Sequence, residues 1–221
     1  MITLPRGKAE FIMGINDPVQ LDLFLKQNSH IIGVAFVGRS NVGKSSLINS
    51  LWGNKTARVS NTPGRTREIN IFKFRLEGAP EVSLPDYYLF DLPGYGFAEA
   101  SKQTLKVWNN LMAVFFSFAS MNIGLISIQD ARHPDQETDK TFYKFMKDFD
   151  YECILALNKI DKLKTQKEKN ALKNSMPEFL AKYKEVKQVF YLSAEKQTGV
   201  KEFHDTIVAF LLKKTEINYK V

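Results

Sequence analysis

A glycine-rich loop between an apolar run and a helical pattern constrains the fold of this chain more than any other feature of its sequence. Residues 31–37 are almost continuously apolar, as a strand covered on both faces requires, and Gly38-Arg-Ser-Asn-Val-Gly-Lys-Ser45 follows directly. The next residues predict a helix from Lys44 to about Trp52, ended by Gly53. A strand, a loop of the spacing G-x-x-x-x-G-K-[ST] and a helix form the phosphate-binding unit of parallel α/β sheets. The sequence therefore predicts an α/β fold with a site for phosphate groups.

The composition of this loop explains how it would hold a chain of phosphates. Glycines allow successive backbone N–H groups to converge on phosphate oxygens, and the start of the helix adds the positive end of its dipole. Lys44 is predicted to reach the β- and γ-phosphates, and the Ser45 hydroxyl to bind Mg²⁺. The residues predicted to contact the nucleotide here are Gly38, Arg39, Ser40, Asn41, Val42, Gly43, Lys44, Ser45 and Ser46. The motif alone does not distinguish ATP from GTP.

The rest of the chain alternates apolar runs of strand length with helical patterns. Further strands are predicted at residues 69–76, 87–92, 123–129, 153–158 and 188–192. The alternation in the first of these indicates one wetter face near the edge of the sheet. Asp17-Pro18 predicts the start of a short helix that ends at Gln27. We therefore predict one domain across residues 1–221, a mostly parallel six-stranded sheet with helices on both faces, in which residues 1–30 form an N-terminal extension carrying a short helix.

A second motif, Asp91-Leu-Pro-Gly94, closes the third predicted strand. The carboxyl end of a strand places Asp91 beside the phosphate loop, where it is predicted to hold Mg²⁺ through a water. The Gly94 N–H is predicted to bind the γ-phosphate, with Leu92 and Pro93 beside it. Tyr95 follows at the position where a glutamine orients the attacking water in Ras-like enzymes, and tyrosine cannot take that role by the same geometry. We therefore expect slow intrinsic hydrolysis, assisted by a partner or a cation.

Two short motifs that follow predicted strands indicate which base is bound. The residues predicted around the base are Asn158, Lys159, Asp161, Ser193, Ala194 and Glu195. Asp161 can accept hydrogen bonds from N1–H and the exocyclic amine of guanine, a pair of donors that adenine lacks. Lys159 is expected along the face of the base, Asn158 is expected to tie the loops together, and the Ala194 N–H is expected to donate to guanine O6. The order of the motifs favours a single P-loop GTPase domain over ATPases and nucleotide kinases.

Composition adds weaker indications. A net charge of +7 and a pI near 9.3 suggest work near nucleic acid, because lysine and arginine displace phosphate counterions. No apolar run approaches the roughly 20 residues of a membrane-spanning helix, and residues 1–16 lack the pattern of a secretory signal. The single cysteine, Cys153, lies in an apolar run and is expected to be buried. The lysine-rich stretch 162–173 is expected to be a solvated loop and the start of a helix, with partner contact as the alternative. Together these features predict a cytoplasmic protein without a membrane partner.

With these motifs placed, the chain from about residue 31 to residue 212 resembles the TrmE-Era-EngA-like GTPases and, more narrowly, the EngB (YihA/YsxC-type) GTPases. The resemblance rests on the phosphate loop, Thr62-Pro-Gly-Arg-Thr-Arg67, Asp91-Leu-Pro-Gly-Tyr-Gly96, Trp108 and Asp130-Ala-Arg-His-Pro134. It implies that Thr66 binds Mg²⁺ and the γ-phosphate in the GTP state, with Gly64 and Arg65 beside it. It also implies a role in assembly of the bacterial large ribosomal subunit, with rRNA and ribosomal proteins as partners and GTP or GDP as ligand. We expect a monomer.

Several alternatives stay open at the level of sequence. The residues predicted to act in hydrolysis are Lys44, Thr66, Gly94 and Asn41. Asn41 has two interpretations, since in several relatives the corresponding asparagine coordinates K⁺, and asparagine also favours the turn itself. The residues that form either an RNA- or protein-facing surface or simply solvated charge are Arg39, Arg65, Arg67, Arg132 and His133. The chain could also be a nearly inactive module that uses the nucleotide as a conformational ligand, or a P-loop kinase or ATPase, for which the sequence supplies no lid or acceptor site.

Overall fold

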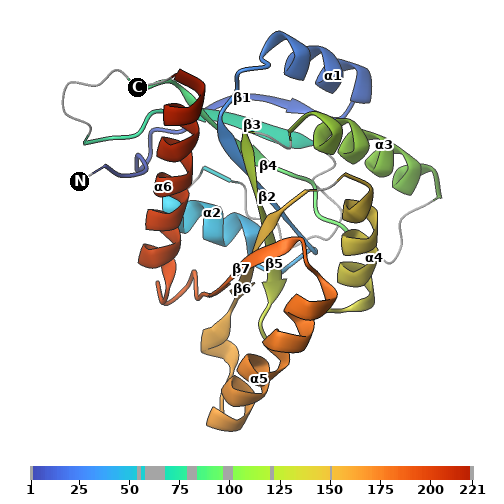
Figure 1. The fold of residues 1–221 in the computed structure, drawn as a ribbon, viewed down its shortest axis with the longest axis vertical. Helices are drawn as coiled ribbons and strands as arrows, with labels where there is room; N and C mark the ends of the chain where they lie inside the picture. The colour runs from blue at the N-terminus through green and yellow to red at the C-terminus, as the bar shows by residue number, and fades with distance from the viewer. Residues whose placement is uncertain are drawn as a thin grey trace.

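The computed structural model describes residues 2–53, 56–57, 68–78, 84–96, 102–119, 122–149 and 151–219. Within these ranges one sheet runs through the centre of the molecule, and helices lie on both of its faces (Figure 1). The strands are β1 (Glu10–Ile15), β2 (Gly33–Gly38), β3 (Ile69–Phe74), β4 (Tyr87–Asp91), β5 (Ile123–Asp130), β6 (Cys153–Asn158) and β7 (Val186–Tyr191). The helices are α1 (Pro18–Gln27), α2 (Lys44–Trp52), α3 (Lys102–Ala119), α4 (Glu137–Met146), α5 (Gln166–Lys182) and α6 (Val200–Tyr219), with 3₁₀ turns η1 (Lys147–Phe149) and η2 (Ile160–Lys162).

The strand order is β1-β3-β4-β2-β5-β6-β7, with the strand before the phosphate loop, β2, in the middle. β2 pairs in parallel with β4 and β5, and β6 and β7 continue the parallel part. β3 is antiparallel to both β1 and β4. The carboxyl ends of the parallel strands therefore meet at one edge of the sheet, where ligands of open α/β sheets bind.

The α/β prediction is confirmed with one correction, since the sequence predicts six strands and the described residues form seven. The additional strand, β1, lies in the extension of residues 1–30 and pairs with β3 from Glu10↔Lys73 to Ile15↔Ile69. As an edge strand it has one neighbour, and its first residues are exposed. It therefore lacks the long apolar run by which a buried strand is recognised. β3 lies one strand in from this edge, in agreement with its predicted wetter face.

Local chemistry sets the ends of the two helices predicted near the phosphate loop. Asp17 caps α1 by accepting a hydrogen bond from the Gln20 N–H at 2.8 Å, with Pro18 at the first position. α2 begins after Gly43 and ends at Gly53, whose φ of 100° favours glycine. The predicted bounds of both helices are confirmed.

The residues of β2 alternate between two hydrophobic cores, which explains why the whole strand is apolar. Ala35 and Val37 pack in the core that includes residues of α1, α3, α4 and α5, whereas Val34 and Phe36 pack in the core that includes residues of α2 and α6. Burying a valine or phenylalanine side chain contributes roughly 1.5–3 kcal/mol. Cys153 is buried in the first core, as predicted, and burial raises the pKa of its thiol, so it acts as a small apolar residue.

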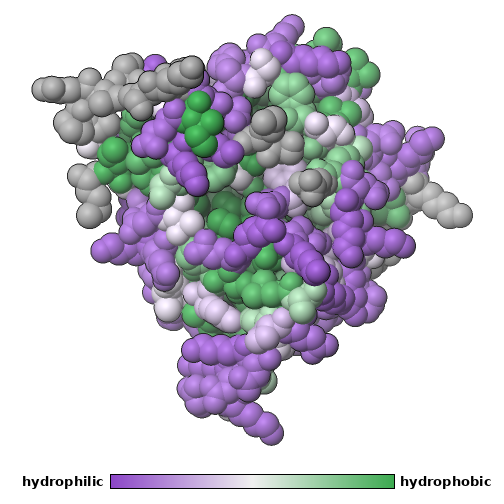
Figure 2. Space-filling view, viewed as in Figure 1, coloured by the Kyte–Doolittle hydropathy of each residue, from purple (hydrophilic) through white to green (hydrophobic). Residues whose placement is uncertain are grey.

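Hydrophilic residues cover much of the face seen in Figure 2. They cover it most completely at the bottom of the view, where Figure 1 shows α5. The first turns of α5 are exposed, which confirms that the lysine-rich stretch 162–173 is a solvated turn and the start of a helix. Among the helices in the described ranges, none is both long enough and apolar enough to cross a membrane.

Candidate nucleotide-binding site

The phosphate loop, residues 38–43, has a backbone that only glycine permits at its two motif positions. A Cβ on Gly38 would lie 2.6 Å from the Ile128 carbonyl oxygen. Gly43 has a φ of 92°, and a Cβ there would lie 2.4 Å from Asn158 Nδ2. Asn41 is exposed and has a φ of 65°, a conformation that asparagine tolerates. This supports the turn-forming interpretation of Asn41, while its binding of K⁺ stays a prediction.

Lys44 and Asp91, predicted to act on the phosphates and on Mg²⁺, lie together at the head of α2. Lys44 opens this helix, Asp91 ends β4, and the Lys44 ammonium donates a hydrogen bond to Asp91 Oδ1. Their side chains are only 12% and 5% exposed. Removing the two charged groups from water costs free energy, and the attraction between the ammonium and the carboxylate offsets part of this cost. A polyphosphate with a bound cation would offer each a new partner, and the contact of Lys44 with the β- and γ-phosphates stays a prediction.

The oxygen atoms of Ser45 and Asp91 are of the kind that binds a magnesium ion. Ser45 lies in the first turn of α2, and Asp91 offers a buried carboxylate. In nucleotide sites Mg²⁺ takes one or two protein oxygens together with phosphate oxygens and waters. Gly64, Arg65 and Thr66 fall outside the described residues, so their contacts stay predictions.

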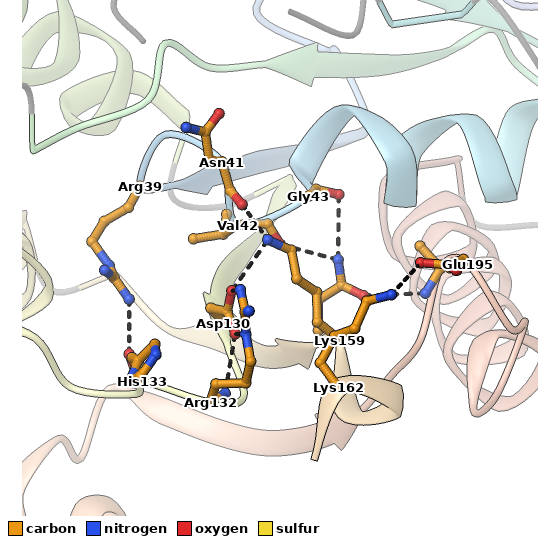
Figure 3. A network of polar contacts seen from close by, with 12 residues as sticks. Arg39, Asn41, Val42, Gly43, Asp130, Arg132, His133, Lys159, Lys162 and Glu195 are labelled. Atoms are coloured by element: carbon orange, nitrogen blue, oxygen red, sulfur yellow. Dashed lines mark hydrogen bonds and ion pairs between the residues drawn. The ribbon is translucent and has the colours of Figure 1, made fainter. Parts of the chain in front are cut away.

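Asn158, at the end of β6, joins the phosphate loop to the loop after β7, as predicted. Its side chain is fully buried. Nδ2 donates to the Val42 carbonyl at 3.1 Å and lies 3.4 Å from the Gly43 carbonyl oxygen, and Oδ1 accepts from the Ala194 N–H at 3.1 Å. In Figure 3 dashed lines run from the carbonyl groups of Val42 and Gly43 to this amide. One amide therefore fixes the base-binding loops relative to the phosphate loop.

Asp161 is oriented by its neighbours before any base is present. The buried Ser193 hydroxyl donates to Asp161 Oδ1 at 2.6 Å, and Lys162 Nζ lies 3.3 Å from Oδ2. Burial opposes ionisation of Asp161, but the hydrogen bonds from Ser193 and Lys162 outweigh it and lower the pKa of the carboxyl. The group is therefore an anion at neutral pH, as an acceptor for two guanine donors must be.

The other two residues of the second base motif contact protein groups. The Ala194 N–H, expected on guanine O6, donates to Asn158, so its bond to the base stays a prediction. Glu195 Oε2 accepts from Lys162 Nζ at 2.9 Å (Figure 3). Since Lys162 also faces Asp161, Glu195 helps to hold the charge that keeps Asp161 ionised. A contact of Glu195 with the base stays a prediction.

Lys159 bridges the base motif to the phosphate loop and to β5. Its ammonium donates to the Asn41 carbonyl and lies 3.1 Å from Asp130 Oδ2 (Figure 3). Burial opposes ionisation of Asp130, but the bonds from Arg132 and Lys159 lower its pKa to about 2. Sequence reasoning missed Asp130 as a site residue, although its position at the end of β5 was the available signal. Arg132, a candidate for surface charge, is exposed, and its Nη2 also lies 2.6 Å from Asp130 Oδ2.

Arg39 is held by protein groups, and its side chain remains 20% exposed, so its part in a partner-facing surface stays a prediction. Its Nε donates to Asp139 Oδ1 at 3.0 Å. Its Nη2 donates to the His133 carbonyl at 2.8 Å, as Figure 3 shows. The Tyr95 hydroxyl donates to the same Asp139 oxygen at 2.9 Å. Burial raises the pKa of Asp139, while Arg39, Tyr95 and the Gln136 N–H favour its ionised form. Asp139 is a functional candidate that sequence reasoning missed, although its place three residues after the Gln136 cap is a capping-box signal.

The remaining predicted residues with a described position are Gly94, Leu92, Pro93 and Ser46. A Cβ on Gly94 would lie 3.1 Å from the Gly38 carbonyl oxygen and 3.5 Å from the Ser40 N, so the two loops approach closely there. Leu92 and Pro93 are buried, which leaves their backbone as the part that can face a ligand. Ser46 is exposed on α2.

Comparisons with known proteins agree with this geometry. The family described as "50S ribosome-binding GTPase" matches residues 33–159, and the "Elongation factor Tu GTP binding domain" matches residues 111–213. The chain is 38% identical over 212 residues to the "Probable GTP-binding protein EngB" of Clostridium botulinum (strain Eklund 17B / Type B), covering 96% of this chain and 98% of that protein. It is 45% identical over 131 residues to the protein of the same name from Kosmotoga olearia, covering 59% of this chain and 64% of that one.

Solved structures give the same fold. A crystal structure of a probable GTP-binding protein engB matches with a TM-score of 0.59 at 24% identity, over 82% of this chain and 99% of that chain. A crystal structure of Aquifex aeolicus Era bound to GDP and AlF₄⁻ matches with a TM-score of 0.62 at 27% identity, over 81% of this chain and 56% of that chain. The chain therefore belongs to the EngB family of P-loop GTPases, which bind GTP and hydrolyse it to GDP and phosphate.

Proposed function

We propose that this GTPase is a molecular switch that acts in assembly of the bacterial large ribosomal subunit in the cytoplasm. The ribosomal role is supported by the matching family, whose description names the 50S subunit, and by the net charge of +7. The switch is supported by one observation above all, the bonds of Asn158 to both the phosphate loop and the Ala194 N–H. Through these bonds of Asn158, the residues proposed to bind the base and those proposed to bind the phosphates form one connected set.

In the proposed ligand-bound state Asp161 gains ligand bonds, whereas Lys44 and Asp91 exchange their bond to each other for ligand groups. Asp161 accepts from the N1–H and the amine of guanine while it keeps the Ser193 bond. Lys44 leaves Asp91 for the β- and γ-phosphates, and Asp91 and Ser45 hold Mg²⁺, which neutralises the phosphate charge. Thr66 is proposed as a further Mg²⁺ ligand in the GTP state.

We propose that hydrolysis by the isolated chain is slow. The residue after Gly94 is Tyr95, which is only 5% exposed and whose hydroxyl donates to Asp139, so it does not orient a water. A cation near Asn41 is proposed to stabilise the developing charge. Turnover should then be faster in K⁺ than in Na⁺ at equal ionic strength, and Asn41→Ala should abolish the difference. Equal rates in the two salts would refute the cation.

The buried Tyr95 also favours a second candidate, a nearly inactive module in which the nucleotide acts as a conformational ligand. Single-turnover hydrolysis with and without large-subunit particles separates the two. Stimulation by the particles supports the switch, whereas turnover that stays negligible in their presence supports the module.

Sedimentation with ribosomal subunits tests the ribosomal role. The purified chain is mixed with small or large subunits in a non-hydrolysable GTP analogue or in GDP, at several salt concentrations. We expect co-sedimentation with the large subunit in the GTP analogue, and weaker binding in GDP. Equal binding to both subunits in both nucleotides, abolished by salt, would contradict the ribosomal role. It would show that the interaction is a non-specific attraction between charges.

A further inference from the structure

Asp139, in the first turn of α4, connects two parts of the nucleotide site that are distant in the sequence. Its carboxylate is fully buried and accepts at Oδ1 from Arg39 Nε at 3.0 Å and from the Tyr95 hydroxyl at 2.9 Å. Its Oδ2 accepts from the Gln136 N–H at 2.9 Å. Arg39 belongs to the phosphate loop, and Tyr95 directly follows Gly94. One carboxylate on a helix therefore anchors both segments.

Packing against α4 fixes Tyr95 in addition to this hydrogen bond. Its ring stacks on Phe142 with a centroid distance of 4.6 Å and an interplanar angle of 5°. The next residue, Gly96, has a φ of 79°, and a Cβ there would lie 3.0 Å from the Thr138 side chain. The segment after Gly94 thus rests on residues of one helical face, Thr138, Asp139 and Phe142.

The position of Tyr95 in turn sets the position of Gly94. The Tyr95 N–H donates to the Gly38 carbonyl at 3.3 Å, and a Cβ on Gly94 would lie 3.1 Å from that same oxygen. The peptide between Gly94 and Tyr95 is therefore held against the phosphate loop. A shift of the Tyr95 ring would move the Gly94 N–H relative to the place of the γ-phosphate, which GTP has and GDP lacks.

We propose that Asp139 is a positioning residue that holds the Gly94 N–H ready for the γ-phosphate by tying Tyr95 to the phosphate-loop residue Arg39. Without this anchor the ordering of the Gly94 segment would have to be supplied by GTP itself, whereas GDP makes no contact there. Asp139 therefore sets the affinity for GTP relative to that for GDP. The inference rests on the proposed GTP-dependent switch, with the contact of Gly94 with the γ-phosphate that the sequence predicts, and not on the ribosomal role.

The test measures the dissociation constants of GDP and of a non-hydrolysable GTP analogue, both with Mg²⁺, by competition with a fluorescent nucleotide. Tyr95→Phe removes one hydroxyl, and Asp139→Asn changes the shared acceptor. The matched control is Tyr143→Phe, since Tyr143 is a fully buried tyrosine of the same helix whose hydroxyl donates to Ser127 at 3.1 Å. Thermal unfolding of every variant reports the loss of stability separately.

We expect Asp139→Asn to weaken the GTP analogue relative to GDP about tenfold, and Tyr95→Phe to do so about threefold. The double variant should equal Asp139→Asn alone, because the two residues act through one hydrogen bond. Tyr143→Phe should lower stability without changing the ratio. An unchanged ratio in both site variants, or an equal change in Tyr143→Phe, would overturn the assignment of Asp139.

Gly94→Ala separates this inference from the switch on which it rests. The added methyl would lie 3.1 Å from the Gly38 carbonyl oxygen and displace the Gly94 N–H. If Gly94→Ala weakens the GTP analogue selectively and Asp139→Asn does not, the switch stands and the coupling is refuted. If Gly94→Ala leaves the ratio unchanged, the γ-phosphate contact itself is refuted, and the coupling with it.

Discussion

Replacing Asp161 by asparagine tests the basis of guanine recognition with the smallest change that the site allows. A carboxylate offers about four lone-pair positions. In the structure Ser193 uses one of them at 2.6 Å, and Lys162 approaches the other oxygen at 3.3 Å. About two positions remain, which is the number that guanine N1–H and its exocyclic amine require. An asparagine keeps one oxygen for Ser193 and turns an amide N–H₂ toward a base that also presents donors.

The expected loss follows from the two hydrogen bonds to a charged acceptor. Each such bond contributes about 1.5–3 kcal/mol, and the lower value applies because the Asp161 side chain, 12% exposed, keeps some contact with water. A loss of about 3–4 kcal/mol corresponds to a fall of about 10²–10³-fold in affinity for GDP. Xanthine carries a carbonyl where guanine carries the amine, so the amide N–H₂ can donate to it. Affinity for xanthosine diphosphate should therefore rise by a similar factor.

Competition of both diphosphates with a fluorescent nucleotide measures these changes. Asp22→Asn, an equal change of charge on the exposed face of α1, is the matched control and should leave both affinities unaltered. If Asp161→Asn kept GDP affinity within about twofold of the unsubstituted chain, the base would be recognised elsewhere and the reasoning would fail.

Three further predictions concern the phosphate side and stability. Gly43→Ala should lower GDP affinity at least about tenfold, because a Cβ there would lie 2.4 Å from Asn158 Nδ2. Gly7 also has a positive φ but open space around its Cβ position, so Gly7→Ala should leave GDP affinity unchanged. Equal effects of the two substitutions would contradict the steric argument. Because the folded-state pKa of Asp130 is about 2 and its ordinary value is 3.8, its ion pairs stabilise the fold by up to about 2 kcal/mol above pH 4 and lose this as the pH falls toward 2. Urea unfolding of Asp130→Asn beside the unsubstituted chain should therefore show a difference at pH 7 that shrinks toward pH 2.5, and a constant difference would refute it. Asp91→Asn should release Lys44, so the affinity for GDP in EDTA should rise, and added Mg²⁺ should no longer increase it. Calorimetric titration of GDP with and without Mg²⁺ measures both effects. An increase of GDP affinity with Mg²⁺ in this variant would contradict the role of Asp91.

The elements that the sequence predicts well are those defined by contacts between near neighbours. The strand before the glycine loop and the cap of α1 by Asp17 depend on a few consecutive residues. The cap appears as predicted, and the strand predicted over residues 31–37 appears as β2, Gly33–Gly38. Asn158 was also placed correctly, because a fixed motif after a buried strand leaves its side chain few partners other than the phosphate loop.

What the sequence did not predict depends on partners far along the chain. β1 is a strand because β3, some sixty residues later, supplies its hydrogen bonds, as in the pair Glu10↔Lys73. Arg39 and Asp139 are separated by 100 positions, so their ion pair could not be inferred from spacing. Long-range partners decide whether a charged residue is solvated or buried, and one sequence without a structure does not supply them.

The two halves of the site differ in what a ligand must displace. On the base side Asp161 is already turned and ionised by Ser193 and Lys162, so a guanine adds bonds without breaking any of these. On the phosphate side Lys44 is bound to Asp91, so a polyphosphate must replace an existing buried contact. Recognition of the base is therefore pre-organised, while the number of phosphates and the presence of a cation decide which contacts are exchanged. It follows that the conformational response to GTP or GDP must begin on the phosphate side, where the bonds of Arg39 and Tyr95 to Asp139 also converge.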